Sequence, residues 1–320
     1  MYNTTMAEDK SGLMLAVRVS LFSNIVLFVI KAIALVIVNS LAIAADLGIS
    51  LISLSVSVFL YYVMKISERP ADHFHNYGYS KIENVAEAIE GIILIGLAIA
   101  MSFQGIMNII RPGQVHAPFV GLVASIIGIG INFWGAEFIL KLAGKYGSPA
   151  LKAEGIHFRL EGFISLAISI SFCLLLIANY GGFVRLAYYI DPLATIFVSI
   201  FIALPSFRIL KEAFMKLLDA SIEEASQMDV IKALAKHYHR YCSFKDLRTR
   251  TAGRKKFVDI FLVIPQTITL KQAHNISRLL KHDISSSLVD SEVHIHIEPC
   301  EKNCAYERQN KKCPYMQQGV

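Results

Sequence analysis

Two ionisable residues, His157 and Glu161, stand four positions apart at the start of the long apolar stretch HFRLEGFISLAISISFCLLLI. In a helix this spacing places both side chains on one face, one turn apart. A charge at membrane depth costs about 2.5–3.5 kcal/mol even on lenient scales, so the pair calls for a function. Imidazole and carboxylate together suit a divalent cation. The alternative is an interfacial pair that reaches water or bonds a neighbouring helix.

The elements that must position this pair are membrane helices. Hydrophobic residues make up 54% of the 320 residues, charged residues only 18%, and the mean hydropathy is +0.50. A soluble domain has about a quarter charged residues. Six stretches have roughly the 17–25 residues that span a lipid bilayer: Leu21–Val38, Leu41–Met64, Ala88–Ile110, Ala117–Leu140, Leu160–Ala178 and Tyr188–Leu204. We therefore predict a multi-pass membrane protein.

The basic residues of the short loops predict the orientation. One side of the predicted bundle is richer in them, with Lys65, Arg69, Lys81, Lys141, Lys145, Lys152 and Arg159. The opposite loops contribute Arg111 and Arg185. Since basic loops stay on the cytosolic side, we expect both termini in the cytosol. This topology explains the net charge of +6, so we expect no nucleic-acid partner.

A second domain begins where the composition turns polar, near residue 208. We predict a helix at Ile222–Tyr241, two strands joined near Gly253, an amphipathic helix at Leu270–Leu288 and a final strand in EVHIHIEP. The order αββαβ indicates a small open sheet with helices on one face. We thus expect a cytosolic tail at 1–11, a six-span transmembrane domain at 12–207, a cytosolic domain at 208–299 and a cysteine-containing tail at 300–320.

Four motifs occur in order along these elements. They are Pro70-Ala71-Asp72-x-x-His75-x-x-Gly78-x-x-Lys81-x-Glu83, His157-x-x-x-Glu161, Asp191-Pro192 and His296-x-Glu298-Pro299. Together they resemble the cation diffusion facilitator family, and most closely its bacterial zinc and ferrous-iron efflux branch. The resemblance covers roughly residues 12–300. It implies a six-helix, all-α transmembrane domain followed by an α+β, ferredoxin-like cytosolic domain that binds metal and tightens a homodimer.

The resemblance also implies a function. Such proteins are secondary transporters, not enzymes, and they export divalent metal across the cytoplasmic (inner) membrane in exchange for protons. We expect Zn²⁺, Fe²⁺ or Mn²⁺ as the substrate and as a possible ligand of the cytosolic domain, with no tightly bound cofactor. The alternative is a family member that no longer transports and serves as a metal sensor or heterodimer partner. An unrelated membrane enzyme is a weaker option.

The family places two metal ligands one turn apart on span two and two more on span five. His157 and Glu161 match span five, with Glu161 where aspartate is usual. Counting back from Pro70 without a gap puts Ile49 and Ser53 at the span-two positions. Isoleucine cannot bind a metal and a neutral serine is a poor ligand, so the transport site diverges in this alignment.

A second alignment fills part of the site. If span two carries a three-residue insertion, Asp46 and Ser50 fall on the ligand positions. Asp46 then joins His157 and Glu161, with Ser50 or water as the fourth ligand. The family also has an aspartate at the start of this helix, which Asp46 matches without a gap. We favour the alignment without a gap.

Further carboxylates enter span three and span four. Glu83, Glu87 and Glu90 recur at helical spacing, and Glu137 lies late in span four. They allow a relocated acidic site, which Mn²⁺ or Fe²⁺ tolerates better than Zn²⁺. The other interpretation, which we favour, places them near the cytosolic interface, solvated or paired with lysines.

The family's accessory metal sites are incomplete. In the loop, Asp72 and His75 match a second site, but Tyr79 stands where another histidine is expected, and His73 is a nearby substitute. The resemblance assigns the cytosolic domain's matching positions to a metal cluster at the dimer interface: His274, His296 and Glu298. Lys245 and Phe261 replace histidines of that cluster, so we expect at most a single weaker site.

Two other features remain open. The resemblance pairs Lys81 with Asp219 as charges near the hinge that hold the dimer together, although two separately solvated charges fit the sequence equally well. Cys300, Cys304 and Cys313 lack paired CxxC spacing. They form either a soft thiolate site that senses or delivers metal, or part of a polar tail, which we favour.

Overall fold

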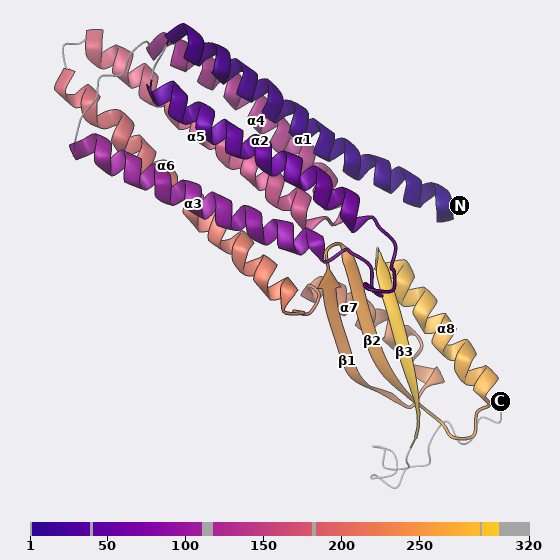
Figure 1. Ribbon diagram of the computed structural model, residues 1–320. Helices are drawn as coiled ribbons and strands as arrows, with labels where there is room; N and C mark the ends of the chain where they lie inside the picture. Colours follow the sequence, from indigo (N-terminus) through magenta and orange to yellow (C-terminus); the bar gives the residue numbers. More distant parts are fainter. Residues whose placement is uncertain (1, 39–40, 111–117, 181–183, 289, 301–320) are drawn as a thin grey trace. The chain divides into compact units, whose positions relative to one another are not determined.

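The computed structural model describes residues 2–38, 41–110, 118–180, 184–288 and 290–300 (Figure 1). At several helix ends only the backbone is described, including the positions of Asp46 and Asp191. The chain divides into two compact units, Met1–Phe214 and Met215–Val320, and each is described by itself.

The first unit is a bundle of long helices (Figure 1). They are α1 (Tyr2–Val38), α2 (Leu41–Ser67), α3 (Ile82–Ile110), α4 (Pro118–Tyr146), α5 (Pro149–Tyr180) and α6 (Val184–Leu217). Within the described residues, four segments are long and apolar enough to cross a membrane: Gly12–Val36, Leu47–Ser67, Ile82–Ile110 and Leu122–Tyr146. These overlap the first four predicted spans, with ends that differ by up to nine residues. The fifth and sixth spans, which correspond to α5 and α6, stay predictions.

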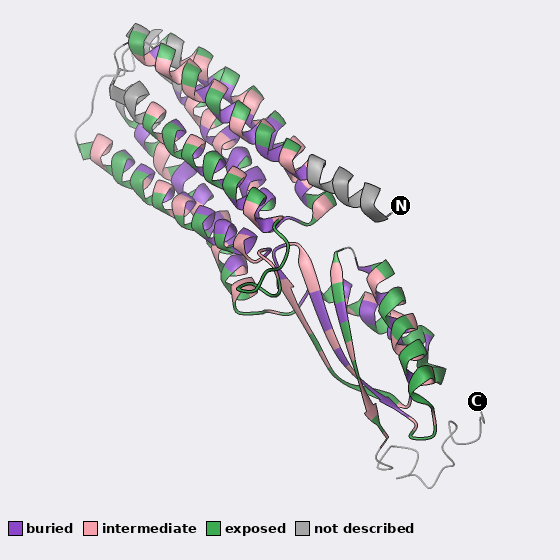
Figure 2. Cartoon of the chain, turned by 45° about the vertical axis from the view of Figure 1, so that its right-hand side comes forward, coloured by how far each residue is buried: buried purple, intermediate pink, exposed green. Residues whose placement is uncertain are grey.

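Helix α5 lies at the centre of the packing. Its residues Leu151 and Phe158 belong to a core shared with α1, α2 and α4. Its residues Leu160 and Ile164 belong to a second core, shared with α3 and α6. Because α5 is covered on several sides, polar residues on its inner faces are buried among other helices (Figure 2).

Glycines allow α4 and α5 to approach closely. A Cβ on Gly155 of α5 would lie 2.6 Å from Leu140 Cγ, and a Cβ on Gly135 of α4 would lie 2.9 Å from the Phe158 ring. Small residues at such positions let membrane helices pack backbone to backbone. This contact fixes the rotation of α5, and therefore the direction in which its polar side chains point.

The second unit has the predicted order αββαβ. It contains α7 (Glu224–Lys236), a short 3₁₀ turn (Tyr238–Arg240), β1 (Ser243–Ala252), β2 (Lys255–Ile264), α8 (Leu270–Ser287) and β3 (Ser291–Pro299). Strand β1 pairs antiparallel with β2 through a turn in which Gly253 has a φ of 60°. Helix α8 carries the chain back so that β3 runs parallel to β2. The predicted fold class is confirmed in this unit.

The alternation of the strands separates a core face from an outer face. Ile260 and Leu262 of β2 and Val293 of β3 are buried against the helices, where they pack with residues such as Leu234 and Leu280. The intervening side chains of β3 are on the other face of the sheet. The first helix is shorter than predicted at both ends. It begins at Glu224, after Ile222, whose N–H bonds the Thr249 hydroxyl, and it ends at Lys236, shortly before the 3₁₀ turn.

Candidate metal centre in the membrane domain

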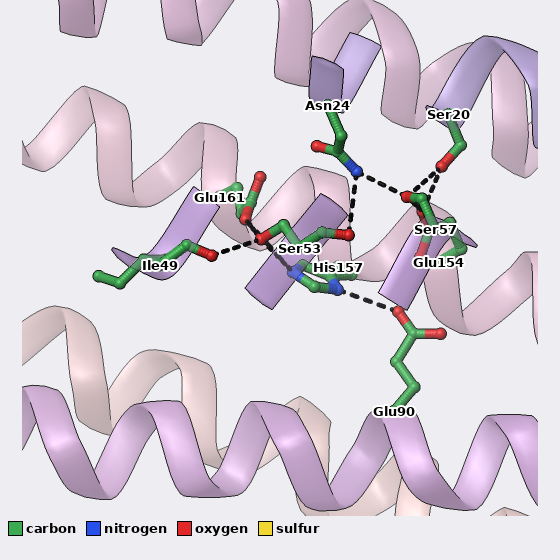
Figure 3. A network of polar contacts seen from close by, with 9 residues as sticks. All are labelled: Ser20, Asn24, Ile49, Ser53, Ser57, Glu90, Glu154, His157 and Glu161. Carbon is green, nitrogen blue, oxygen red and sulfur yellow. Dashed lines mark hydrogen bonds and ion pairs between the residues drawn. The ribbon is translucent and has the colours of Figure 1, made fainter. Parts of the chain in front are cut away.

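A histidine lies between two carboxylates inside the helix bundle (Figure 3). His157 of α5 is 3% exposed, and its Nε2 lies 3.3 Å from Oε1 of Glu161, one turn further along the same helix. Its Nδ1 lies 3.1 Å from Oε1 of Glu90, which comes from α3. Both imidazole nitrogens therefore face an acidic group, each on a different side of the ring.

Helix α2 reaches the same centre through Ser53. The Ser53 hydroxyl is within donating distance of Glu161 Oε1 and lies 3.5 Å from His157 Nε2. The Ser53 hydroxyl is also 3.2 Å from the backbone oxygen of Ile49. The structure thus brings Ser53 onto the predicted pair, as the alignment without a gap expects. Ser50 is buried nearby, and the side chain of Asp46 lies outside the described residues, so the second alignment stays a prediction.

A third carboxylate, Glu154, completes the centre. Glu154 is 1% exposed, and its Oε1 accepts hydrogen bonds from the hydroxyls of Ser20 on α1 and Ser57 on α2, the latter at 2.7 Å. Asn24 of α1 donates in turn to the Ser57 hydroxyl at 2.7 Å. The other oxygen of Glu154, Oε2, is buried and has no hydrogen-bond partner among the described residues.

Glu154 lies next to His157 and Glu90. One potential ligand atom from each of these three residues lies within 4.8 Å of the other two. Glu154 was not among the predicted ligands. Its spacing could have indicated it, because residues 154, 157 and 161 have the i, i+3, i+7 spacing of a single helix face. The serines and Asn24 gave no comparable signal, because short polar residues are common in membrane helices.

The span-three glutamates are buried and not solvated, while their position near the cytosolic interface and their pairing with lysines stay predictions. Glu83, Glu87 and Glu90 are 0%, 2% and 4% exposed, because this face of α3 turns toward the other helices. Glu83 accepts a hydrogen bond from the Ser148 hydroxyl at 2.6 Å, and Glu87 accepts one from Asn84 at 3.4 Å. Of the three, Glu90 is the one that reaches the His157 centre.

Glu137, the remaining extra carboxylate, lies on the outside of the bundle. Its side chain is 76% exposed, and its Oε1 is 2.8 Å from a guanidinium nitrogen of Arg159. This pairing satisfies its charge away from the His157 centre, so Glu137 is not part of that centre.

The chemistry of the centre is that of a cation site. Carboxylate oxygens and an imidazole nitrogen are established ligands of divalent metals. Buried carboxylates this close together repel one another unless a cation or a proton lies between them. The centre can therefore hold either a metal ion or protons, on groups that come from α3 and α5 and are oriented by α1 and α2.

The predicted metal ligands in the loop between α2 and α3 form a hydrogen-bonded turn. Asp72 Oδ1 accepts the backbone N–H groups of Phe74 and His75 at 2.9 and 2.8 Å, and its Oδ2 accepts the Tyr79 hydroxyl at 2.6 Å. The Tyr79 bond, followed by the His75 backbone bond, holds the pKa of the Asp72 carboxyl below its usual value. The predicted ligands lie close together, with His75 Nδ1 3.5 Å from Asp72 Oδ1, but that oxygen already accepts two backbone N–H groups, and Tyr79 occupies the other oxygen.

The metal ligands predicted in the cytosolic domain do not lie close together within one chain. Glu298 lies 3.4 Å from the Lys245 ammonium, and the His296 ring lies 5.1 Å from the Phe261 ring. His274 is exposed on α8, which covers the opposite face of the sheet. Within the described residues of one chain these three predicted ligands form no cluster, so a site shared between subunits stays a prediction.

The structure describes only some of the residues in the predicted hinge pair and the cysteine-containing tail. Lys81 and Asp219 belong to different units, so their pairing stays a prediction. Within its own unit, Asp219 lies 3.6 Å from Arg250. Cys300 is partly buried, whereas Cys304 and Cys313 lie outside the described residues.

Comparison with known proteins settles the family. A family model described as a cation efflux transmembrane domain matches residues 17–218. A second, described as the cytoplasmic domain of a cation efflux protein, matches residues 224–300. The chain belongs to the cation diffusion facilitator family. It is therefore a membrane protein of a transporter family, not an enzyme.

Curated relatives match this family member over most of its length. The cation-efflux pump FieF of Shewanella oneidensis is 26% identical over 285 residues, which cover 89% of this chain and 93% of that protein. The FieF pumps of Cronobacter sakazakii and Salmonella arizonae are each 27% identical over 274 residues, covering 86% of this chain and 88% of each pump.

Proposed function

We propose that this cation diffusion facilitator exports a divalent metal ion across the cytoplasmic membrane in exchange for protons. The observation that carries the proposal is the buried imidazole of His157, held between Glu90 and Glu161 and next to Glu154. Burying such a set of ionisable groups among apolar helices is costly, and a bound cation would compensate that cost. The names of the relatives, cation-efflux pumps, agree with this assignment.

The mechanism uses the same groups for metal and protons. Metal ligands must be deprotonated to bind, so an ion that enters from the cytosol displaces protons from the centre. When the bundle opens to the other side, protons return to these groups and the ion leaves. Alternating access of this kind has a single binding centre that faces each side in turn.

The assembly belongs to the same proposal. We place both termini in the cytosol, in line with the basic loops, and we expect a homodimer. The family model matched by residues 224–300 is named for dimers, which supports the second expectation. Metal bound between the cytosolic domains of the two subunits would add to the stability of such a dimer.

One observation favours a rival function. Ile49, at a family ligand position in the alignment without a gap, has no side-chain atom that can bind a metal, and its backbone oxygen lies 3.2 Å from the Ser53 hydroxyl. A protein with a depleted site of this kind serves equally well as a metal sensor or as the silent partner of a heterodimer. Transport therefore has to be measured directly.

The test is metal transport in proteoliposomes with Zn²⁺, Fe²⁺, Mn²⁺ and Co²⁺. Wild-type protein is compared with His157→Ala, which removes the central ligand, and with Glu87→Gln, which changes a buried carboxylate of α3 outside the centre. We expect transport of at least one metal by the wild type and by Glu87→Gln, and none by His157→Ala. Absence of transport from a well-folded wild type would favour the sensor or partner role.

A further inference from the structure

The two nitrogens of His157 offer two alternative positions for the ion. A metal takes one nitrogen of an imidazole, and the other N–H usually donates to an acidic group that fixes the ring. In this structure Glu161 and Ser53 lie on the Nε2 side, whereas Glu90 lies on the Nδ1 side. The residues on each side decide which nitrogen binds the metal.

The Nε2 side of His157 has few groups that could bind a metal. Glu161 is the carboxylate on this side, the positive charge of Lys31 acts on it, and the Ser53 hydroxyl already lies within donating distance of it. Ile49, one turn before Ser53, adds an apolar side chain. A hydroxyl that satisfies a carboxylate favours an orienting role for Glu161, since an ion on this side would have to compete with that bond.

The Nδ1 side of His157 has the ligand groups of a metal site. Glu90 and Glu154 bring two carboxylates within 4.8 Å of the imidazole, all three from residues at most 4% exposed. Hydroxyls from two other helices hold Oε1 of Glu154, and its buried Oε2 has no hydrogen-bond partner among the described residues. An oriented carboxylate with a free buried oxygen calls for a cation.

We propose that the ion binds on the Nδ1 side of His157, coordinated by Glu90, Glu154 and His157, while Glu161 accepts the Nε2 hydrogen and fixes the ring. The proposal deepens the proposed function, because it assigns the ligands of the transported ion. Two carboxylates and one imidazole form an oxygen-rich set, which suits Mn²⁺ or Fe²⁺. Glu90 then makes α3 a ligand-bearing helix in place of α2.

The test is Mn²⁺ binding to the purified full-length protein, measured by calorimetry and by electron paramagnetic resonance. Glu90→Gln and Glu154→Gln each remove a ligand charge, so we expect the affinity to fall by at least about 100-fold. Glu161→Gln keeps an oxygen that accepts the Nε2 hydrogen, so the affinity falls by about tenfold at most, within the range of orienting residues. Glu87→Gln, the matched control on α3, leaves the affinity unchanged.

Two results would overturn the assignment. The first is a loss of Mn²⁺ binding in Glu161→Gln with wild-type affinity in Glu90→Gln and Glu154→Gln, which would place the ion on the Nε2 side. The second is an absence of Mn²⁺ and Fe²⁺ binding by a folded wild type. Transport separates this failure from that of the proposed function: if Glu90→Gln and Glu154→Gln still export metal and His157→Ala does not, the protein is a transporter whose ligands lie elsewhere.

Discussion

The orientation of Glu154 depends on residues that never need to touch the ion. Ser20 and Ser57 donate to one oxygen of this carboxylate, and Asn24 donates to the Ser57 hydroxyl. Asn24 thereby directs the Ser57 hydrogen toward Glu154, because a hydroxyl that accepts from an amide has its own hydrogen free to donate. These contacts leave the second carboxylate oxygen available to a ligand.

Removing the Ser57 hydroxyl tests this orienting role. In Ser57→Ala, Glu154 keeps its charge but loses one of its two hydroxyl donors, so we expect Mn²⁺ affinity to fall about tenfold, as for other groups that orient metal ligands. Ser55→Ala is the control, since the Ser55 hydroxyl is exposed on α2 and donates to the backbone of Leu51. Equal affinity in both variants would show that Glu154 is held by other contacts.

The sequence predicted part of this centre. The spacing of His157 and Glu161 is visible because both belong to one helix, and Glu154 shares that periodicity. Glu90 was recognised as an extra carboxylate, but its position beside His157 depends on how α3 packs against α5. Such a contact between residues 67 positions apart has no signature in the pattern of a single helix.

At the scale of elements, the contact between α4 and α5 sets the position of the centre. Gly155 is next to Glu154 in the chain, and its Cα faces Leu140 at a distance that leaves no room for a side chain. A displacement of α5 at this point would move the carboxylate and the imidazole together.

Gly155→Val tests this packing. The new Cβ would lie 2.6 Å from Leu140 Cγ and 3.3 Å from the Leu140 backbone nitrogen, so the helices must separate. We expect a loss of about 1–3 kcal/mol in stability, the usual cost of overpacking, measured as a lower thermal unfolding midpoint in detergent. Gly130→Val on α4 is the control because a Cβ there meets nothing within 4 Å. Matching midpoints for the two variants would contradict the close contact.

In the cytosolic domain, an ion-pair cluster joins the end of α7 to α8. Asp283 Oδ2 lies 2.8 Å from the Lys236 ammonium and 2.7 Å from His237 Nε2. These contacts, that from Lys236 foremost, hold the pKa of the Asp283 carboxyl well below its usual value. The charged carboxylate is therefore favoured by folding, and its contribution is present above the unfolded pKa of about 4 and is lost as the pH falls below it.

Asp283→Asn should reveal this contribution. At pH 7 we expect the variant to unfold at a lower temperature than the wild type, with a difference that shrinks as the pH falls below about 4. The measurement is thermal unfolding followed by circular dichroism over a pH series. Asp229→Asn serves as the comparison, because Asp229 pairs with Lys232 on the exposed surface of a single helix. A pH-independent difference would rule out the ion-pair explanation.

Elements were predictable where their pattern is strong and local. The alternation of EVHIHIEP and the Gly253 turn predicted β3 and the β1–β2 hairpin within one or a few residues. The helix predicted at Ile222–Tyr241 ends earlier, at Lys236, and a 3₁₀ turn follows. It also begins later, because Ile222 is buried next to β1 by a tertiary contact that no helical periodicity reports. Tertiary contacts of this kind override local preference.

At the scale of the whole molecule, the composition already separated a membrane part from a cytosolic part. The family models divide the chain between residues 218 and 224, close to the change in composition near residue 208. The direction of transport, by contrast, depends on how the bundle opens to each side, which composition does not report. That property has to be measured on the intact protein in a membrane.

The most direct measurement follows metal and proton fluxes simultaneously in proteoliposomes, with Mn²⁺ and Zn²⁺ tested separately, for wild type, His157→Ala and Glu87→Gln. We predict that metal moving in one direction is accompanied by protons moving in the other, in the wild type and in Glu87→Gln, and that His157→Ala abolishes both. Metal flux without proton flux would contradict the exchange. Full activity of His157→Ala would show that the buried centre of α3 and α5 is not the route of the ion.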